Sequence, residues 1–275
     1  MAGMGGIGKT AMALHIAHQM ATEGYFPDAQ LYIDLKGTSR QPLDPAAALE
    51  TLLTALLGAD PGRPDDLEGL ARLWHSTLQG KRALLVLDNA ANAAQVRPLL
   101  PASPTCTVLV TSRQRFTLPG VALLDLDRLS TEDSRAMLKA LAPHLDDAAA
   151  DAITERCGGL PLAIRIAGNY LALNDGFPPD EYAALLADVR SRLAHLSDPL
   201  DPDLDVAATF SLSVAQLEMG MRWAWTLLGL LPAPFDSRAA AALWGEGVSR
   251  DAWARLDEET TIEWLNALRN RSLVN

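Results

Sequence analysis

The stretch GMGGIGKT, running from Gly3 to Thr10, decides the fold of this 275-residue chain. It satisfies the pattern G-x-x-x-x-G-K-[ST] and leads into residues 10–20, whose apolar side chains recur at helical spacing. In such a loop, glycines let successive backbone N–H groups converge on phosphates, while the start of the helix adds a favourable partial positive charge. We therefore predict a P-loop that binds an adenine nucleotide. The alternative is a glycine turn with a chance lysine.

The side chains of this loop suggest separate tasks within a nucleotide site. Lys9 would neutralise the outer phosphates, and the hydroxyl of Thr10 would bind Mg²⁺, a hard cation that prefers oxygen ligands. The predicted nucleotide-binding residues of the segment are Gly3, Met4, Gly5, Gly6, Ile7, Gly8, Lys9, Thr10 and Ala11. A P-loop normally follows a central strand, but only Met1 and Ala2 precede this one. We therefore expect the first strand to be missing and the chain to be a fragment.

Several short apolar segments are typical of strands in a parallel sheet. The candidate strands are residues 29–37, 82–90, 107–113 and 121–127. The second and third are continuously apolar, as are strands that are buried on both faces of a sheet. Helical patterns at 45–57 and 67–78 lie between the first two strands. Strands separated by helices predict a three-layer α/β unit, which we assign to residues 1–128.

The pattern changes to helices alone after this unit. Ser130 and Asp133 form a capping signal for one helix, and we expect Asp147 to cap the next. Pro161 suits the first turn of a third helix, because its missing N–H costs nothing there. These elements predict a small helical domain at residues 129–197.

The segment 196–205, with its prolines and acidic residues, is the predicted linker to a last unit. Further helical patterns follow it and stop at Asn275, so we assign residues 198–275 to a truncated helical domain. The fold class is thus an α/β P-loop sheet followed by two helical units.

Asp88 closes the apolar run ALLVLD, where a carboxylate can reach the magnesium ion beside a P-loop. The competing interpretation is a cap at the end of a strand. Asn89 follows, where many hydrolysing enzymes of this type place a second acidic residue to activate water. Without that carboxylate we expect slow turnover and at most a weak ATPase.

Arg113 ends the run TVLVTSR, where a guanidinium could contact the γ-phosphate through charge-assisted hydrogen bonds. A surface arginine after a strand is the alternative. Together with Lys9 and Asp88, Arg113 completes the set of candidate catalytic residues, and Thr10 and Asp88 are the candidate metal ligands.

The composition limits the binding partners and the cellular location that we expect for the protein. The net charge of −11 argues against a broad nucleic-acid surface, which needs clustered Lys and Arg. No apolar run is long enough to span a membrane, and the N-terminus lacks the features of a secretory signal. We therefore expect a cytoplasmic protein without a membrane partner.

Four motifs, in this order, carry a resemblance to a known family. GMGGIGKT, LLVLDN, LVTSR and CGGLPLAI resemble the motifs of the NB-ARC family, P-loop ATPases of the STAND class that act in signal transduction. The segments FSLSVAQL and LLGLLPAPFD resemble the start of that family's winged-helix domain. The sequences LYIDLKG and VLDNAANAAQVRPLLP are most similar to the form of this family that is found in large actinobacterial transcriptional regulators.

The resemblance implies roles for further residues. Pro161 of the GLPL motif would pack against the adenine, although it could simply start a helix, and Arg113 would be the sensor arginine. The unit at 198–275 would be a truncated winged helix, and the family's latching histidine would lie beyond Asn275. The implied activity is an ADP/ATP switch that uses Mg²⁺, self-associates in the ATP state and acts through flanking effector and sensor domains.

Two other functions stay open. An actively hydrolysing P-loop ATPase or kinase would use the same loop, but Asn89 weighs against efficient catalysis. A DNA-binding winged helix is the second alternative. The acidic charge weighs against it, although Arg269 and Arg271 lie close together.

Overall fold

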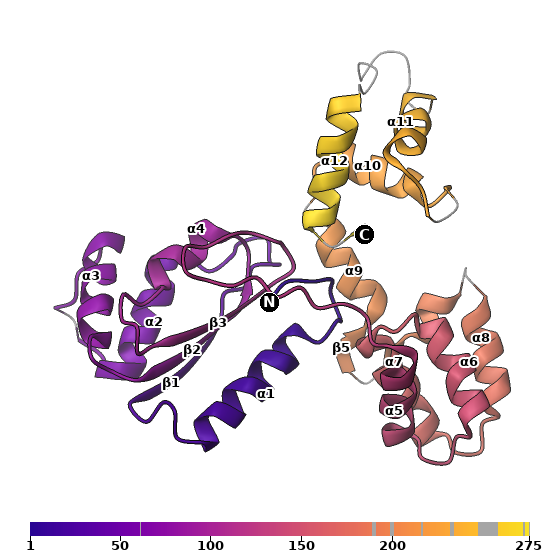
Figure 1. The fold of residues 1–275 in the computed structure, drawn as a ribbon, viewed down its shortest axis with the longest axis horizontal. Helices are drawn as coiled ribbons and strands as arrows, with labels where there is room; N and C mark the ends of the chain where they lie inside the picture. The colour runs from indigo at the N-terminus through magenta and orange to yellow at the C-terminus, as the bar shows by residue number, and fades with distance from the viewer. Residues whose placement is uncertain are drawn as a thin grey trace.

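The computed structural model describes residues 1–60, 62–188, 191–198, 201–215, 217–231, 234–246, 258–271 and 273–274. An α/β unit is followed by a bundle of short helices and by a last group of helices (Figure 1). The elements of the α/β unit are α1 (Lys9–Thr22), β1 (Ala29–Asp34), α2 (Pro45–Leu57), α3 (Leu67–Leu78), β2 (Ala83–Ala90), α4 (Ala93–Val96), η1 (Arg97–Leu99) and β3 (Thr107–Ser112). The predicted α/β class is confirmed.

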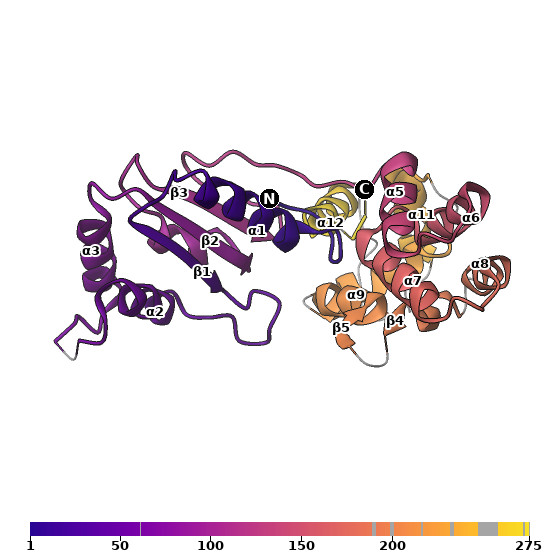
Figure 2. The same cartoon turned by 90° about the horizontal axis from the view of Figure 1, so that it is seen from below.

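Strands β1, β2 and β3 form a parallel sheet in that order. Every residue of β2 except Asn89 is buried, which explains why its sequence is apolar without alternation. Helix α1 lies on one face of the sheet and α2 with α3 on the other (Figure 2). A core between the sheet and α2 and α3 includes the fully buried Trp74, whose Nε1 donates to the carbonyl of Leu99 at 2.9 Å.

Met1 and Ala2 hold the place of a strand beside β3. The amide of Ser112 donates to the carbonyl of Met1 at 3.0 Å, and on the other side the amide of Leu126 donates to the carbonyl of Ala2 at 2.9 Å. The strand predicted at 121–127 was wrong in extent, because it is reduced to one bridge at Asp125. Two backbone hydrogen bonds join this segment to Ala2: the Ala2 amide donates to the carbonyl of Leu124 at 2.8 Å, and the Leu126 amide donates to the carbonyl of Ala2 at 2.9 Å.

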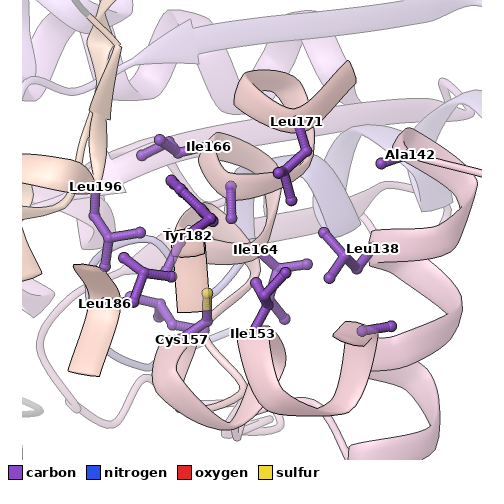
Figure 3. Packing of buried hydrophobic residues seen from close by; sticks show 14 of the residues in the cluster. Leu138, Ala142, Ile153, Cys157, Ile164, Ile166, Leu171, Tyr182, Leu186 and Leu196 are labelled. Carbon is purple, nitrogen blue, oxygen red and sulfur yellow. The ribbon is translucent and has the colours of Figure 1, made fainter. Parts of the chain in front are cut away.

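The bundle after the sheet consists of α5 (Thr131–Leu141), α6 (Asp147–Cys157), α7 (Pro161–Leu173) and α8 (Pro179–Ala187). Its core is apolar, with Leu138, Ile153, Ile164 and Leu186 among the fully buried side chains (Figure 3). Helix α8 was not predicted from the sequence.

The caps of two bundle helices test the predicted signals. Asp133 and Ser130 form the predicted cap of α5, with the Asp133 amide donating to the Ser130 hydroxyl at 3.0 Å. The cap predicted at Asp147 was wrong by one residue. Asp146 has the extended backbone that a cap needs and accepts from the amide of Ala149 at 2.8 Å.

The segment predicted as a linker contains two short paired strands, β4 (Ser197–Asp198) and β5 (Asp201–Asp205), which are antiparallel. The helices that follow among the described residues are α9 (Val206–Ala215), α10 (Met219–Leu228), α11 (Ser237–Glu246) and α12 (Glu258–Asn270). Val206 at the start of α9 is buried in the bundle core, while the later helices share a core around Trp244. Among the described residues, no helix combines the length and apolar character needed to cross a membrane.

Candidate functional site

The loop from Gly3 to Gly8 turns sharply and opens directly into α1. Gly8 has a φ of 94° at the N-terminal cap, a conformation that residues with a Cβ rarely adopt. No side chain caps this end of α1. The first N–H groups of a helix have no partner within the helix, so this loop can offer them to an anion.

Lys9 is folded back over the loop. Its Nζ donates to the carbonyl oxygens of Gly3 at 2.9 Å and of Met4 at 2.8 Å, and only 9 % of the residue is exposed. Burial, with a further contribution from the charge of Arg113, lowers the pKa of Lys9 to about 7, while Asp88 opposes the shift. A buried ammonium in this environment would be strongly stabilised by a nearby anion.

Asp88 accepts hydrogen bonds from three hydroxyl groups at the end of β2. Its Oδ1 accepts from Thr10 at 2.9 Å and from Thr111 at 2.5 Å, and its Oδ2 accepts from Tyr32 at 3.2 Å. Burial, followed by the charge of Asp88, raises the pKa of Tyr32 to about 12. Only 6 % of the Asp88 residue is exposed.

The structure brings Thr10 and Asp88 together, as the sequence predicted for the two metal ligands. A hydroxyl and a carboxylate are oxygen ligands of the kind that Mg²⁺ takes beside phosphates, so this pair fits such an ion. Sequence reasoning missed the contact from Tyr32. Only the pairing of β1 with β2 brings that side chain to Asp88.

Asn89 follows Asp88 in a left-handed conformation, with a φ of 53°. Its backbone N–H donates to Thr111 Oγ1 at 2.9 Å, and its Nδ2 lies 3.2 Å from Asp34 Oδ1 and 3.4 Å from Thr38 Oγ1. The carboxylate of Asp34 therefore lies beside Asn89, the residue that carries an amide in place of a second acidic side chain. Sequence reasoning missed Asp34, because the proximity arises from the strand register that pairs it with Asp88.

Arg113 is held by a helix that lies far away in the sequence. Its Nη1 donates to the carbonyl of Thr209 at 2.6 Å and to the hydroxyl of Ser213 at 3.1 Å, both on α9. Burial lowers the pKa of Arg113. Hydrogen bonds to α9 thus fix the orientation of the Arg113 side chain. The motif TVLVTSR does not reveal this contact.

The start of α7 closes over the loop. The amide of Leu162 donates to the carbonyl of Gly6 at 3.1 Å. A Cβ added to Gly6 would lie 2.9 Å from the Cβ of Leu162, so this contact leaves no room for a larger residue. Pro161, next to Leu162, therefore lies beside the P-loop, although the two motifs are far apart in the sequence.

These residues surround one cavity of about 500 Å³. Its lining residues are Gly5, Gly6, Gly8, Lys9, Thr10, Ala11, Asp88, Asn89, Thr111, Ser112, Arg113, Met137, Pro161, Leu162, Arg165 and Thr209. Most of the predicted site thus meets in one place. Met137, Arg165 and Thr209 come from helices and were missed, because no motif marks them.

Three predicted binding residues are placed differently. The cavity wall formed by described residues does not include Gly3, Met4 or Ile7. Ile7 is 5 % exposed as a residue and belongs to the core of the helical bundle. It joins the loop to that bundle, so only its backbone could contact a ligand.

Comparison with known proteins agrees with this geometry. Residues 1–139 match the NB-ARC domain family. The chain belongs to the NB-ARC family. It therefore carries the nucleotide-binding module of that family, and the resemblance predicted from the four motifs is confirmed.

Several curated relatives contain this NB-ARC region. The regulatory protein AfsR of Streptomyces griseus is 43 % identical over 279 aligned positions, which cover all of this chain and 27 % of that protein. AfsR of Streptomyces coelicolor is 44 % identical over 88 % of the chain and 24 % of its own length. Disease resistance RPP13-like protein 4 of Arabidopsis thaliana is 27 % identical over 63 % of the chain and 22 % of its own length. The chain thus spans about a quarter of the length of the AfsR proteins it matches.

Proposed function

We propose that this NB-ARC chain is an ADP/ATP-binding switch within a larger signalling or transcription-regulatory protein. One observation carries the proposal: the walls of a single cavity come from the P-loop, from the strand ends and from α7 and α9 of the helical units. A ligand that fills this cavity would contact all of these parts. Exchange of ADP for ATP could therefore shift the population between closed and open arrangements.

In this proposal each residue has a defined task. The loop from Gly3 to Ala11 binds the phosphates, Thr10 and Asp88 hold Mg²⁺, and Pro161 contacts the adenine. The ion would neutralise charge on the phosphates, while Lys9 and Arg113 bind their oxygens. Hydrolysis is slow in this proposal, because Asn89 offers an amide where a general base would stand.

The wider assignments follow from the same proposal. Residues 1–128 bind the nucleotide, 129–197 close over it, and 198–275 begin a winged helix that controls access. The protein is cytoplasmic, and the ATP state self-associates and passes the signal to flanking domains. We do not assign DNA binding to this chain, in view of its net charge of −11.

Nucleotide content tests the proposal directly. The chain is purified after expression, and its bound nucleotide is measured by chromatography for the wild type, Lys9→Ala and the control Lys81→Ala, whose lysine lies outside the cavity. Wild type and control should carry ADP, and Lys9→Ala should carry little or none. Equal nucleotide content in all three proteins would overturn the site assignment.

A fast enzyme is the alternative with a specific observation in its favour, since Asp34 brings a carboxylate to Asn89. Steady-state ATP turnover well above about 1 per second, the low end of typical enzyme rates, would support that alternative over a switch.

A further inference from the structure

Arg165 lies on α7, four residues after Pro161, and lines the same cavity as the P-loop. Four residues are about one helical turn, so Arg165 and Pro161 share one face of α7. No motif assigns a role to this arginine. Arg165 therefore places a positive charge on the part of the cavity wall that the helical bundle forms.

The charges around the cavity are unbalanced. Lys9, Arg113 and Arg165 line it, and Asp88 is the acidic residue among its described lining residues. Lys9 is bound by loop carbonyls and Arg113 by Thr209 and Ser213 of α9. Within the described part of the chain, Arg165 has no hydrogen-bond or ion-pair partner in the structure. Cations that converge on one cavity repel one another unless an anion lies between them.

We propose that Arg165 binds a phosphate group of the nucleotide from the side of the helical bundle. This inference rests on the proposed nucleotide site and adds a contact to it. The phosphates would then be bound by the P-loop on one side and by α7 on the other. A guanidinium suits this task, because its N–H groups match two phosphate oxygens at once.

In this proposal, nucleotide binding is coupled to closure of the helical bundle over the P-loop. The start of α7 contacts the loop through Leu162 and Gly6 without any charged group. A phosphate bound by Arg165 adds an attraction between the same two units. The polyphosphate, rather than the adenine alone, would therefore hold the bundle against the loop.

Two substitutions separate charge from packing at this position. Arg165→Met keeps an unbranched apolar stem and removes the charge, whereas Arg165→Lys keeps the charge. Arg156→Met is the matched control, because Arg156 is an exposed arginine on the neighbouring helix α6 and does not line the cavity. The affinity for ADP with Mg²⁺ is measured by calorimetry on the nucleotide-free chain, and circular dichroism reports whether each variant folds.

We expect Arg165→Met to bind ADP about tenfold or more weakly, as is typical for the loss of a charge-assisted hydrogen bond. Arg165→Lys should lose less affinity for ADP than Arg165→Met, and Arg156→Met should bind ADP as tightly as the wild type. At saturating ADP, hydrogen exchange at the start of α7 should slow in the wild type and less in Arg165→Met.

The results that would overturn the proposal are distinct. If the wild type binds ADP and Arg165→Met binds equally well, Arg165 makes no phosphate contact. Equal losses in Arg165→Met, Arg165→Lys and the control Arg156→Met would show that a contact at Arg165 is not the cause. Failure of the wild type to bind ADP would overturn the nucleotide site itself, and this inference with it.

Discussion

The hydroxyl of Thr10 lies 2.9 Å from Oδ1 of Asp88, although 78 residues separate the two along the chain. Thr10 is the last residue of the P-loop motif, and Asp88 lies near the end of β2, the central strand of the sheet. Their meeting produces an oxygen site next to the cavity in which we place the phosphates.

This pair predicts a magnesium effect. For the wild type, chelation of Mg²⁺ by EDTA should weaken ADP binding, because the ion bridges protein and phosphate oxygens. Asp88→Asn should bind ADP with an affinity that EDTA changes little. The control Asp65→Asn alters an exposed carboxylate outside the cavity and should keep the full response. An undiminished EDTA effect in Asp88→Asn would remove this residue from the metal site.

The lowered pKa of Lys9 predicts a stability that depends on pH. The folded chain releases the Lys9 proton near pH 7, whereas the unfolded chain keeps it up to the ordinary value of 10.5. Between these values the unfolded state binds more protons, so the free energy of unfolding should rise with pH in this range. Lys9→Met should lack this part of the rise. Chemical denaturation of both proteins from pH 6.5 to 10 measures the difference, and parallel curves would contradict the prediction.

The same group predicts proton uptake on binding. Phosphates stabilise the ammonium form of Lys9 and raise its pKa again. At about pH 8, where the free protein holds this lysine mainly neutral, ADP binding should take up nearly one proton, and affinity should fall as the pH rises further. Calorimetry in two buffers with different ionisation enthalpies counts the protons. An identical binding enthalpy in both buffers would speak against a neutral Lys9.

Gly6 tests the contact between loop and bundle. Gly6 and Gly24 have nearly the same φ, 77° and 76°, but an added Cβ meets Leu162 at 2.9 Å only at Gly6, while at Gly24 nothing lies within 4 Å. Gly24→Ala should cost about 1 kcal/mol for its backbone strain. Gly6→Ala should cost roughly 1 to 3 kcal/mol more, because the loop and α7 must separate. Equal losses in thermal unfolding would mean that the bundle does not rest on the loop in solution.

Asn89 and Asp34 predict an electrostatic defect. Asn89→Asp would place a second carboxylate where Nδ2 now lies 3.2 Å from Asp34 Oδ1. The repulsion between the two carboxylates should cost roughly 1 kcal/mol of stability at pH 7, measured by chemical denaturation. The double variant Asp34→Asn with Asn89→Asp restores one amide and one carboxylate and should recover most of the loss. A double variant as unstable as Asn89→Asp would refute this explanation.

Local patterns predicted the regular elements well. The strands around 29–37, 82–90 and 107–113 and the helices at 45–57 and 67–78 lie where the sequence placed them, because hydrophobic period and capping residues act over a few neighbouring positions. The errors also had local causes. Residues 121–127 have the composition of a strand, but a strand needs a partner of matching length, which Met1 and Ala2 do not provide.

The sequence by itself determined the P-loop, the strand that carries Asp88 and the proline that starts α7, since each depends on residue types at fixed spacing. Only the tertiary structure decided what faces them. Tyr32 and Asp34 reach the site through the register of β1 with β2, Thr209 and Ser213 hold Arg113 through α9, and Arg165 joins the cavity because α7 lies on the loop. These contacts join residues that are distant along the chain. No local spacing encodes them, because they depend on how whole elements pack against one another.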